Sequence, residues 1–193
     1  MGLEVGLVTS FHEDFSIEPL DGIRIYNYKS DKTTTFRNVY TSSGREQCLL
    51  KRAESLGMEH IPEEWLTTKI IHLGAVPKEI NPETGFNFPD ANVCISLQGW
   101  LREWDENGTI QPSPFPVIKN PFPENTSAFL SIEDLGFDRS SLEYLCSLFP
   151  LLVLTKGIDG AEFYWKDKIK SISVNSRDEV DQPGSEIYLL QLL

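Results

Sequence analysis

The sequence predicts an α/β fold in which a small antiparallel β-sheet accompanies a larger, mainly parallel one. Residues 23–50 predict the small sheet, because apolar and polar residues alternate there and β-branched and aromatic residues are frequent. Compact apolar runs predict the large sheet, because buried parallel strands lose this alternation and are separated by segments long enough for crossovers. These runs are Lys69–Gly74, Ala91–Ser96, Ala128–Ser131 and Leu151–Thr155.

Length and composition fit one globular domain, or part of a somewhat larger one. Of the 193 residues, 40% are hydrophobic and 24% are charged, as in ordinary globular proteins. Acidic residues outnumber basic ones by 29 to 17, which gives a formal net charge of -12. Such a surface repels phosphate backbones and anionic lipids, so neither nucleic acid nor a membrane is an expected partner. No apolar run is long enough for a membrane-spanning helix.

The cysteines indicate a reducing compartment. Cys48, Cys94 and Cys146 are far apart, lie among apolar neighbours and form no C-x-x-C or Cys/His cluster. A zinc site is therefore not expected, and the three residues are interpreted as buried, reduced thiols. Together with the lack of a signal peptide, this predicts a cytoplasmic protein.

The elements of the first half follow from local pattern. Gly6–Ser10 is an apolar run with a polar end, which predicts a short buried strand. Within residues 23–50, the turn Ser42-Ser43-Gly44 separates extended segments of an antiparallel sheet with one wet face. Five prolines between residues 108 and 125 predict an ordered loop rather than a helix.

The second half predicts one clear helix and one hairpin. Ser140–Phe149 places apolar residues on one helical stripe, with Ser140 or Ser141 as the N-cap. Gly160–Trp165 and Ile169–Val174 are expected to form a hairpin through Lys166-Asp167-Lys168. Glu186–Leu193 is expected to begin a helix.

A series of segments then follows in a characteristic order along nearly the whole chain: GLVTSFHEDF, TTTFRNVYTSSGREQ, IIHLGAVPKE, VCISLQGWLREWD, FLSIEDL, LLVLTKGIDGAEFYW and DEVDQPGSEIYLL. Their order resembles that of the PfkB (ribokinase-like) carbohydrate kinases. The resemblance implies a partial ribokinase-like three-layer sandwich as a single domain over residues 1–193, with residues 23–50 as a β lid over the sugar. It also implies transfer of the γ-phosphate of ATP, with Mg²⁺, to a sugar or nucleoside hydroxyl.

The resemblance assigns the catalytic loop to residues 181–188. The family's D-x-x-G-A-G-D motif provides a general base and, at a helix N-terminus, an anion hole for the phosphoryl group. With a one-residue gap, Glu186 takes the position of the base, and Gly184 and Ser185 that of the anion hole. Without the gap, Ile187 stands at the base position and cannot accept a proton. Glu186 also fits a simpler role, that of a carboxylate interacting with a helix dipole.

Two further motifs imply a nucleotide and a metal. Thr155, Gly157 and Gly160 match the family's nucleotide-bordering T-x-G-x-x-G segment, although alone this is a common strand-to-turn sequence. Ser131-Ile132-Glu133-Asp134 stands at the N-x-x-E motif, which implies a metal-side role for Asp134. That role is compatible with a helix cap provided by Ser131.

In the lid, the substrate candidates are Thr35, Phe36, Asn38 and Arg45, with surface residues as the alternative interpretation. His12 stands where the family commonly has glycine, before the acidic pair Glu13-Asp14.

The departures from the family pattern keep two functions open. The family's first strand, its glycine-rich sugar-binding segment and the helical region after the base have no counterpart, so the chain resembles a member truncated at both ends. One hypothesis is an active carbohydrate kinase with nucleotide and sugar or nucleoside ligands. The other is a catalytically inactive fragment or pseudokinase that binds a ligand or another subunit. A homodimer would form through the lid or an open sheet.

Overall fold

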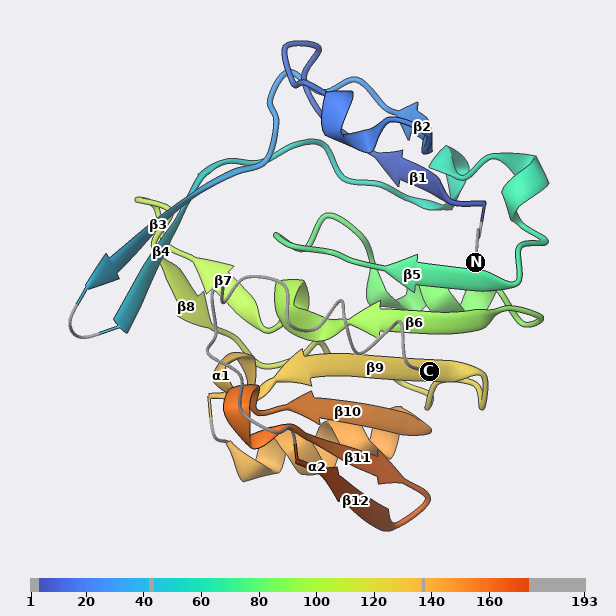
Figure 1. The fold of residues 1–193 in the computed structure, drawn as a ribbon, viewed down its shortest axis with the longest axis vertical. Coiled ribbons are helices and arrows are strands. Elements are labelled where there is room, and N and C mark those ends of the chain that lie inside the picture. The colour runs from blue at the N-terminus through green and yellow to red at the C-terminus, as the bar shows by residue number, and fades with distance from the viewer. Residues whose placement is uncertain (1–3, 42–43, 137, 174–193) are drawn as a thin grey trace.

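The computed structural model describes residues 4–41, 44–136 and 138–173, and its largest element is a six-stranded sheet (Figure 1). The strand order is β12-β11-β10-β9-β6-β5. β5, β6, β9 and β10 run parallel, which confirms the prediction for the four apolar runs, and β11 and β12 form the predicted hairpin. The bounds are β5 Ile70–Leu73, β6 Asn92–Ser96, β9 Thr126–Ser131, β10 Leu151–Thr155, β11 Ala161–Trp165 and β12 Lys168–Ile172.

One face of this sheet carries the main hydrophobic core. Ile95, Leu130 and Leu152 are fully buried there, and Leu145 of helix α2 (Arg139–Leu148) joins the same cluster. In Figure 1 α2 lies behind β10 and β11. The apolar stripe of the predicted helix therefore faces the sheet, where its burial stabilises both elements.

The N-cap of α2 differs from the predicted one. Asp138, not Ser140 or Ser141, is the cap, and its carboxylate accepts hydrogen bonds from both serine amides. The two serine hydroxyls also donate to Asp138. The helix begins one residue earlier because an ionised carboxylate has two oxygens to offer the free N–H groups of the first turn.

The first two strands form a separate sheet. β1 (Gly6–Thr9) and β2 (Arg24–Asn27) pair in parallel, so the antiparallel arrangement expected for all of residues 23–50 does not hold for β2. The connection between them contains η1 (Glu18–Leu20). It exceeds the roughly dozen residues that a parallel crossover needs, which allows the chain to return to the same end of the sheet.

Within the lid predicted over residues 23–50, the antiparallel pair is formed by β3 (Thr35–Thr41) and β4 (Gly44–Lys51), with a bulge between Thr35 and Phe36; this pair is called the lid below. In Figure 1 it projects on the side toward which β5, β6, β9 and β10 point. The hairpin of β7 (Arg102–Trp104) and β8 (Ile110–Pro112) adjoins it, and the Leu49 amide donates to the Gly108 carbonyl at 2.8 Å. Gly108 has a φ of +81°, a conformation that favours glycine.

Short 3₁₀ segments, rather than long helices, make up most of the remaining described connections. They are η2 Met58–His60, η3 Glu63–Trp65, η4 Pro82–Asn87, η5 Leu97–Trp100 and η6 Gly157–Asp159, with one short α-helix, α1 Ile132–Leu135. The predicted proline-rich loop includes β8 at its start. Within the described ranges, the helices are all too short or too polar to cross a membrane.

Candidate functional site

Hydroxyl-bearing residues end three neighbouring parallel strands. Ser96 ends β6, Ser131 ends β9 and Thr155 ends β10, and Thr155 lies opposite Ser131 in the strand register. In open α/β sheets, ligands bind outside the carboxyl ends of the strands. This edge is therefore the first candidate site, and it is the edge on which the lid lies (Figure 1).

A buried polar network stands at the end of β9. Arg102 Nη2 lies 2.6 Å from Asp134 Oδ1, and the two side chains are only 9% and 3% exposed. The Ser131 hydroxyl donates to Asp134 Oδ2 at 2.6 Å, while the Asp134 amide donates to Ser131 Oγ at 3.1 Å. Gln98 Nε2 approaches both carboxylate oxygens at 3.4 Å. Ser131 is thus the N-cap of α1, as predicted, and Asp134 is engaged by protein donors.

This engagement bears on the metal role predicted for Asp134. A cation that bound this carboxylate directly would lie beside the Arg102 guanidinium and would compete with Arg102 and Ser131 for its oxygens. Among the described residues, no group of three or more His, Cys, Asp or Glu side chains could hold a metal ion. These residues do not form a Mg²⁺ site by themselves, and the metal role of Asp134 stays a prediction.

The predicted nucleotide-bordering segment forms a tight turn after β10. Gly157 and Gly160 have φ values of +56° and +88°, and they enclose η6. A Cβ at Gly160 would lie 1.9 Å from the carbonyl oxygen of Ile172, so this position requires glycine. Thr155 is buried, and its hydroxyl donates to the Leu130 carbonyl at 3.4 Å. The glycines have a clear structural role, and their contact with a nucleotide stays a prediction.

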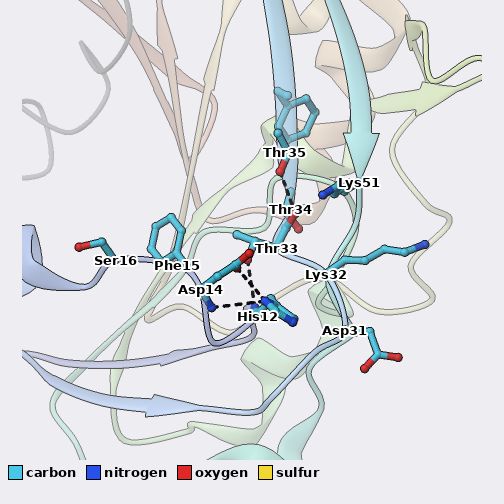
Figure 2. A pocket seen from close by; sticks show the side chains of 11 residues that line it. His12, Asp14, Phe15, Ser16, Asp31, Lys32, Thr33, Thr34, Thr35 and Lys51 are labelled. Atoms are coloured by element: carbon cyan, nitrogen blue, oxygen red, sulfur yellow. Dashed lines mark hydrogen bonds and ion pairs between the residues drawn. The ribbon is translucent and has the colours of Figure 1, made fainter.

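A second candidate site is a pocket at the base of the lid, with a volume of about 640 Å³ (Figure 2). Its wall combines three consecutive threonines, two phenylalanines, two lysines and two aspartates from three parts of the chain. The lining residues are His12, Asp14, Phe15, Ser16, Asp31, Lys32, Thr33, Thr34, Thr35, Phe36 and Lys51. Such a mixture of hydroxyls, paired charges and ring faces suits a small polyhydroxylated ligand.

Hydrogen bonds hold the segment after β1 against the start of the lid. The His12 amide donates to Thr33 Oγ1 at 3.0 Å, and the Thr35 hydroxyl donates to the Thr33 carbonyl at 2.9 Å. His12 Nδ1 lies 2.7 Å from Asp14 Oδ1. The hydrogen bond from His12 lowers the pKa of Asp14, so this carboxylate is charged at neutral pH and able to accept hydrogen bonds.

Two of the four predicted lid residues line this pocket. Thr35 and Phe36 do so, while the exposed side chain of Asn38 is not part of its wall. The backbone of Arg45 pairs with Tyr40 across the hairpin.

Sequence reasoning gave no site role to His12, Asp14 or Lys51. A signal was available for the first two, because they lie shortly after the apolar run Gly6–Ser10, and ligand-binding residues of α/β folds gather after the strands. The strand itself, β1, is only half-buried rather than buried as predicted. Lys51 gave no such signal, since it enters the pocket only through the pairing of β4 with β3.

The predicted catalytic loop lies outside the described residues. Glu186, Gly184 and Ser185 all belong to residues 174–193, so their roles stay predictions. The three cysteines are free, as expected, although they are half-buried rather than fully buried.

No family model and no curated protein sequence matches the chain. Solved structures do. A pyrophosphate-dependent kinase in the ribokinase family aligns with a TM-score of 0.69 at 15% identity, covering 91% of this chain and 66% of that one. Ribokinase from Arabidopsis thaliana aligns at 0.57 and 13%, covering 91% and 62%. A nucleoside kinase from Methanocaldococcus jannaschii aligns at 0.53 and 15%, covering 92% and 61%.

These likenesses show that the chain has a ribokinase-like fold, here as a partial α/β sandwich with antiparallel β pairs. The chain spans about two thirds of the length of the solved structures that it matches. The fold is thus similar to that of sugar and nucleoside kinases even though few residues are identical.

Proposed function

We propose that the chain belongs to the PfkB-type carbohydrate kinase lineage and binds a polyhydroxylated ligand in the pocket at the base of its lid. The observation that carries this proposal is the pocket itself, in which Thr35 and Phe36 of the lid meet His12 and Asp14. Support also comes from the solved neighbours, which are sugar and nucleoside kinases of the same fold. A fold does not identify a ligand by itself, so the class of ligand has to be inferred from the residues that line the pocket.

The wall offers what a polyol needs. Asp14 accepts hydrogen bonds from ligand hydroxyls, and Lys51 donates to their oxygens. Phe15 and Phe36 provide flat apolar surfaces for the C–H face of a ring. The two lysines and two aspartates of the wall have balanced charges, which favours a neutral ligand over a strongly ionic one.

Phosphoryl transfer would also need the first candidate site, at the carboxyl ends of the parallel strands, and the catalytic loop. The donor phosphates would lie at the carboxyl ends of β9 and β10, near Thr155, Gly157 and Gly160, and Glu186 would take the proton of the ligand hydroxyl. Gly184 and Ser185 would donate backbone N–H groups to the transferred phosphoryl group. Bound Mg²⁺ would neutralise charge on the phosphate oxygens.

ATP is the donor that the family resemblance implies, and pyrophosphate is a second candidate. One specific observation favours it: the pyrophosphate-dependent kinase aligns at a TM-score of 0.69, against 0.57 for the ribokinase complexed with ribose and ATP. A pyrophosphate-dependent kinase in the ribokinase family complexed with a pyrophosphate analogue and myo-inositol also aligns, at a TM-score of 0.68. The alternative to turnover in either case is a non-catalytic chain that binds the polyol without phosphorylating it, or that acts as an interaction module.

Calorimetry with myo-inositol and with ribose tests the binding step first. We expect one of the two to bind, and Asp14→Asn to weaken that binding by about tenfold, because a charged acceptor is worth roughly 1.5–3 kcal/mol. Asp167→Asn is the matched control, since Asp167 lies in the exposed β11–β12 turn. Equal affinity of both variants, or no binding of either polyol, would refute the pocket assignment.

The catalytic step is tested separately. With ATP or pyrophosphate and Mg²⁺ present, formation of a phosphorylated polyol identifies the donor. Glu186→Gln should then abolish phosphorylation while polyol affinity is unchanged, because the amide cannot accept the proton. Binding without any product would identify the non-catalytic alternative.

A further inference from the structure

The six-stranded sheet has two faces, and α2 packs on only one of them. Paired residues of neighbouring strands point to the same face, so the register divides the apolar side chains of the sheet into two sets. Leu145 and Leu148 of α2 pack with the first set, which includes Leu130 and Leu152. Since α2 lies behind the sheet in Figure 1, the second face is turned toward the viewer. Parallel strands are normally covered on both faces, so this second face also needs a cover.

The second face carries an apolar cluster of its own. Its members come from β6, β9, β10 and β11: Cys94, Phe129, Leu151, Val153, Ala161 and Phe163. Side chains stand roughly perpendicular to a sheet, so neighbours in the same sheet cover their flanks but not their outer ends. Phe129 and Val153 are nevertheless 1% and 0% exposed. Their burial requires a layer above the sheet, and among the described residues this apolar cluster contains strand residues alone.

Residues 187–193 have the composition of a buried segment. Apart from Gln191 and the hydroxyl of Tyr188, all of their side chains are apolar. In the helix predicted to begin at Glu186, Leu189 and Leu193 would form a stripe opposite Gln191, because each residue turns the helix by about 100°. A helix of about two turns is marginal in water by itself, so this one needs an apolar surface to pack on. The same chain therefore contains an apolar segment and an apolar face that needs a cover.

The connection from β12 is long enough to bring this segment to the second face. β12 and β10 are both antiparallel to β11, so β12 ends at the carboxyl edge of the parallel strands. The 13 residues 174–186 reach about 43 Å when extended, at about 3.3 Å per residue. Three strand spacings of about 4.8 Å separate β12 from β9, which is about 14 Å in all. A two-turn helix is about 10 Å long and about 10 Å wide, so it covers the cluster from β9 to β11.

We propose that residues 187–193 pack as a helix on the second face of the sheet, with Leu189 and Leu193 turned toward the apolar cluster. The linker keeps this segment near the sheet at an effective concentration in roughly the millimolar range, an advantage that the same segment of a second copy lacks. The sheet is then self-contained on this face, in contrast to a homodimer through an open sheet. The proposal concerns packing alone, so it does not depend on the proposed function.

The three cysteines allow this packing to be measured in the full chain. Cys94 belongs to the cluster on the second face, whereas Cys146 of α2 packs with the main core and Cys48 lies on β4 of the lid. Burial raises the pKa of the Cys94 thiol, so loss of its cover should increase both its accessibility and its thiolate fraction. The rate at which Cys94 reacts with a maleimide, followed by peptide mass spectrometry, therefore reports on the cover.

Leu189→Asp is the variant that should remove the cover, because it places an unpaired charge against the apolar cluster. Gln191→Asp is the matched control, since it adds the same charge on the opposite side of the helix. We expect Cys94 to react about tenfold faster in Leu189→Asp than in the wild type or in Gln191→Asp, while Cys48 and Cys146 keep their rates. Equal Cys94 rates in the two variants would overturn the proposal.

A cross-link decides the matter if Leu189→Asp opens the whole chain, which would accelerate all three cysteines alike. Leu189→Cys retains a small apolar side chain, and a short bis-maleimide should join the new thiol to Cys94 within one chain. Asp167→Cys is the control and should give no such link, because Asp167 lies in the exposed turn at the other end of β11 and β12. Linkage of residue 189 to Cys48 or Cys146 instead, or between two chains, would refute the packing.

Discussion

The six-stranded sheet and the β3–β4 lid are both built from β-strands, but they are held in place by different forces. In the sheet, Leu152 is 0% exposed and packs among other fully buried apolar side chains. In the lid, Leu50 is 52% and Tyr40 is 59% exposed, although Leu49 is buried. Burial of apolar surface stabilises the sheet, whereas the lid depends on pairing between its own strands and a few contacts at its base.

This difference separates stability from ligand binding. The sheet forms a rigid frame whose carboxyl edge carries Ser131 and Thr155, and the lid brings Thr35 and Phe36 to a pocket outside that frame. Elements with few buried contacts open at low free-energy cost. A change in the lid should therefore alter ligand binding well before it alters the unfolding of the whole chain.

The largest expected effect is on the free energy of unfolding, and a matched pair of leucine substitutions measures it. Leu152→Ala should lower the free energy of unfolding by about 3 kcal/mol, because it leaves a cavity in a fully packed cluster. Leu50→Ala should change it by less than about 0.5 kcal/mol, because half of that side chain is already in water. Urea denaturation followed by tryptophan fluorescence measures both. Similar losses for the two variants would show that the lid belongs to the same cooperative core.

A matched pair of glycine substitutions tests the contact between the lid and the β7–β8 hairpin. Gly108 and Gly22 have φ values of +81° and +86°, but only at Gly108 would a Cβ meet backbone, 2.2 Å from the Leu49 carbonyl oxygen. Gly22→Ala should lower the free energy of unfolding by about 1 kcal/mol, because alanine strains the backbone at this φ. Gly108→Ala should lower it by about 1 kcal/mol more, because the added Cβ also disturbs the hydrogen bond with Leu49. The Leu49 amide, which donates to Gly108, should exchange about tenfold faster in Gly108→Ala alone. An unchanged Leu49 amide would argue against this contact holding the lid.

The smallest expected effect is the pH dependence of the stability of α2, the helix behind the sheet. Hydrogen bonds from Ser141 and Ser140 lower the pKa of Asp138, the N-cap of α2. A carboxyl whose pKa is lowered by folding stabilises the folded state fully above its unfolded pKa, and the contribution is lost as the pH falls through the folded value. The protection factors of the α2 amides, which are exchange rates corrected for the intrinsic effect of pH, should therefore fall below about pH 4. Asparagine at position 138 caps the helix as well but does not titrate, so Asp138→Asn should remove the pH dependence of protection in α2. If that pH dependence is unchanged in the variant, another carboxyl group causes it.

The central strands could be predicted because the length of their apolar runs and the polar segments around them favour strands. Ala91–Ser96, Ala128–Ser131 and Leu151–Thr155 are too short for typical buried helices, whereas strands buried in a sheet have this length. The ribokinase-like fold followed from the order of such runs and their motifs, and the solved structures confirm it. The pairing of β2 could not be predicted in this way, because the alternation in Arg24–Asn27 is the same for parallel and antiparallel strands.

The candidate site was only partly predictable for a similar reason. Thr35 and Phe36 were found from the lid pattern, whereas Lys51 reaches the pocket through strand pairing with residues far away in sequence. The buried partner of Asp134 also escaped sequence reasoning. Arg102 lies between Trp100 and Trp104, in a segment that gave no sign of a charged partner, and the fold brings its guanidinium to 2.6 Å from that carboxylate.

The sequence by itself determined the local elements: where apolar runs form strands, where Ser131 begins a helix, and where glycine is needed for a turn. These depend on neighbouring residues and on steric limits of the backbone. Only the tertiary structure decided which charges are neutralised in the interior, which lid residues share a pocket with His12 and Asp14, and which face of the sheet carries the main core. Those outcomes depend on contacts between residues distant in sequence, which the packing of the whole chain selects.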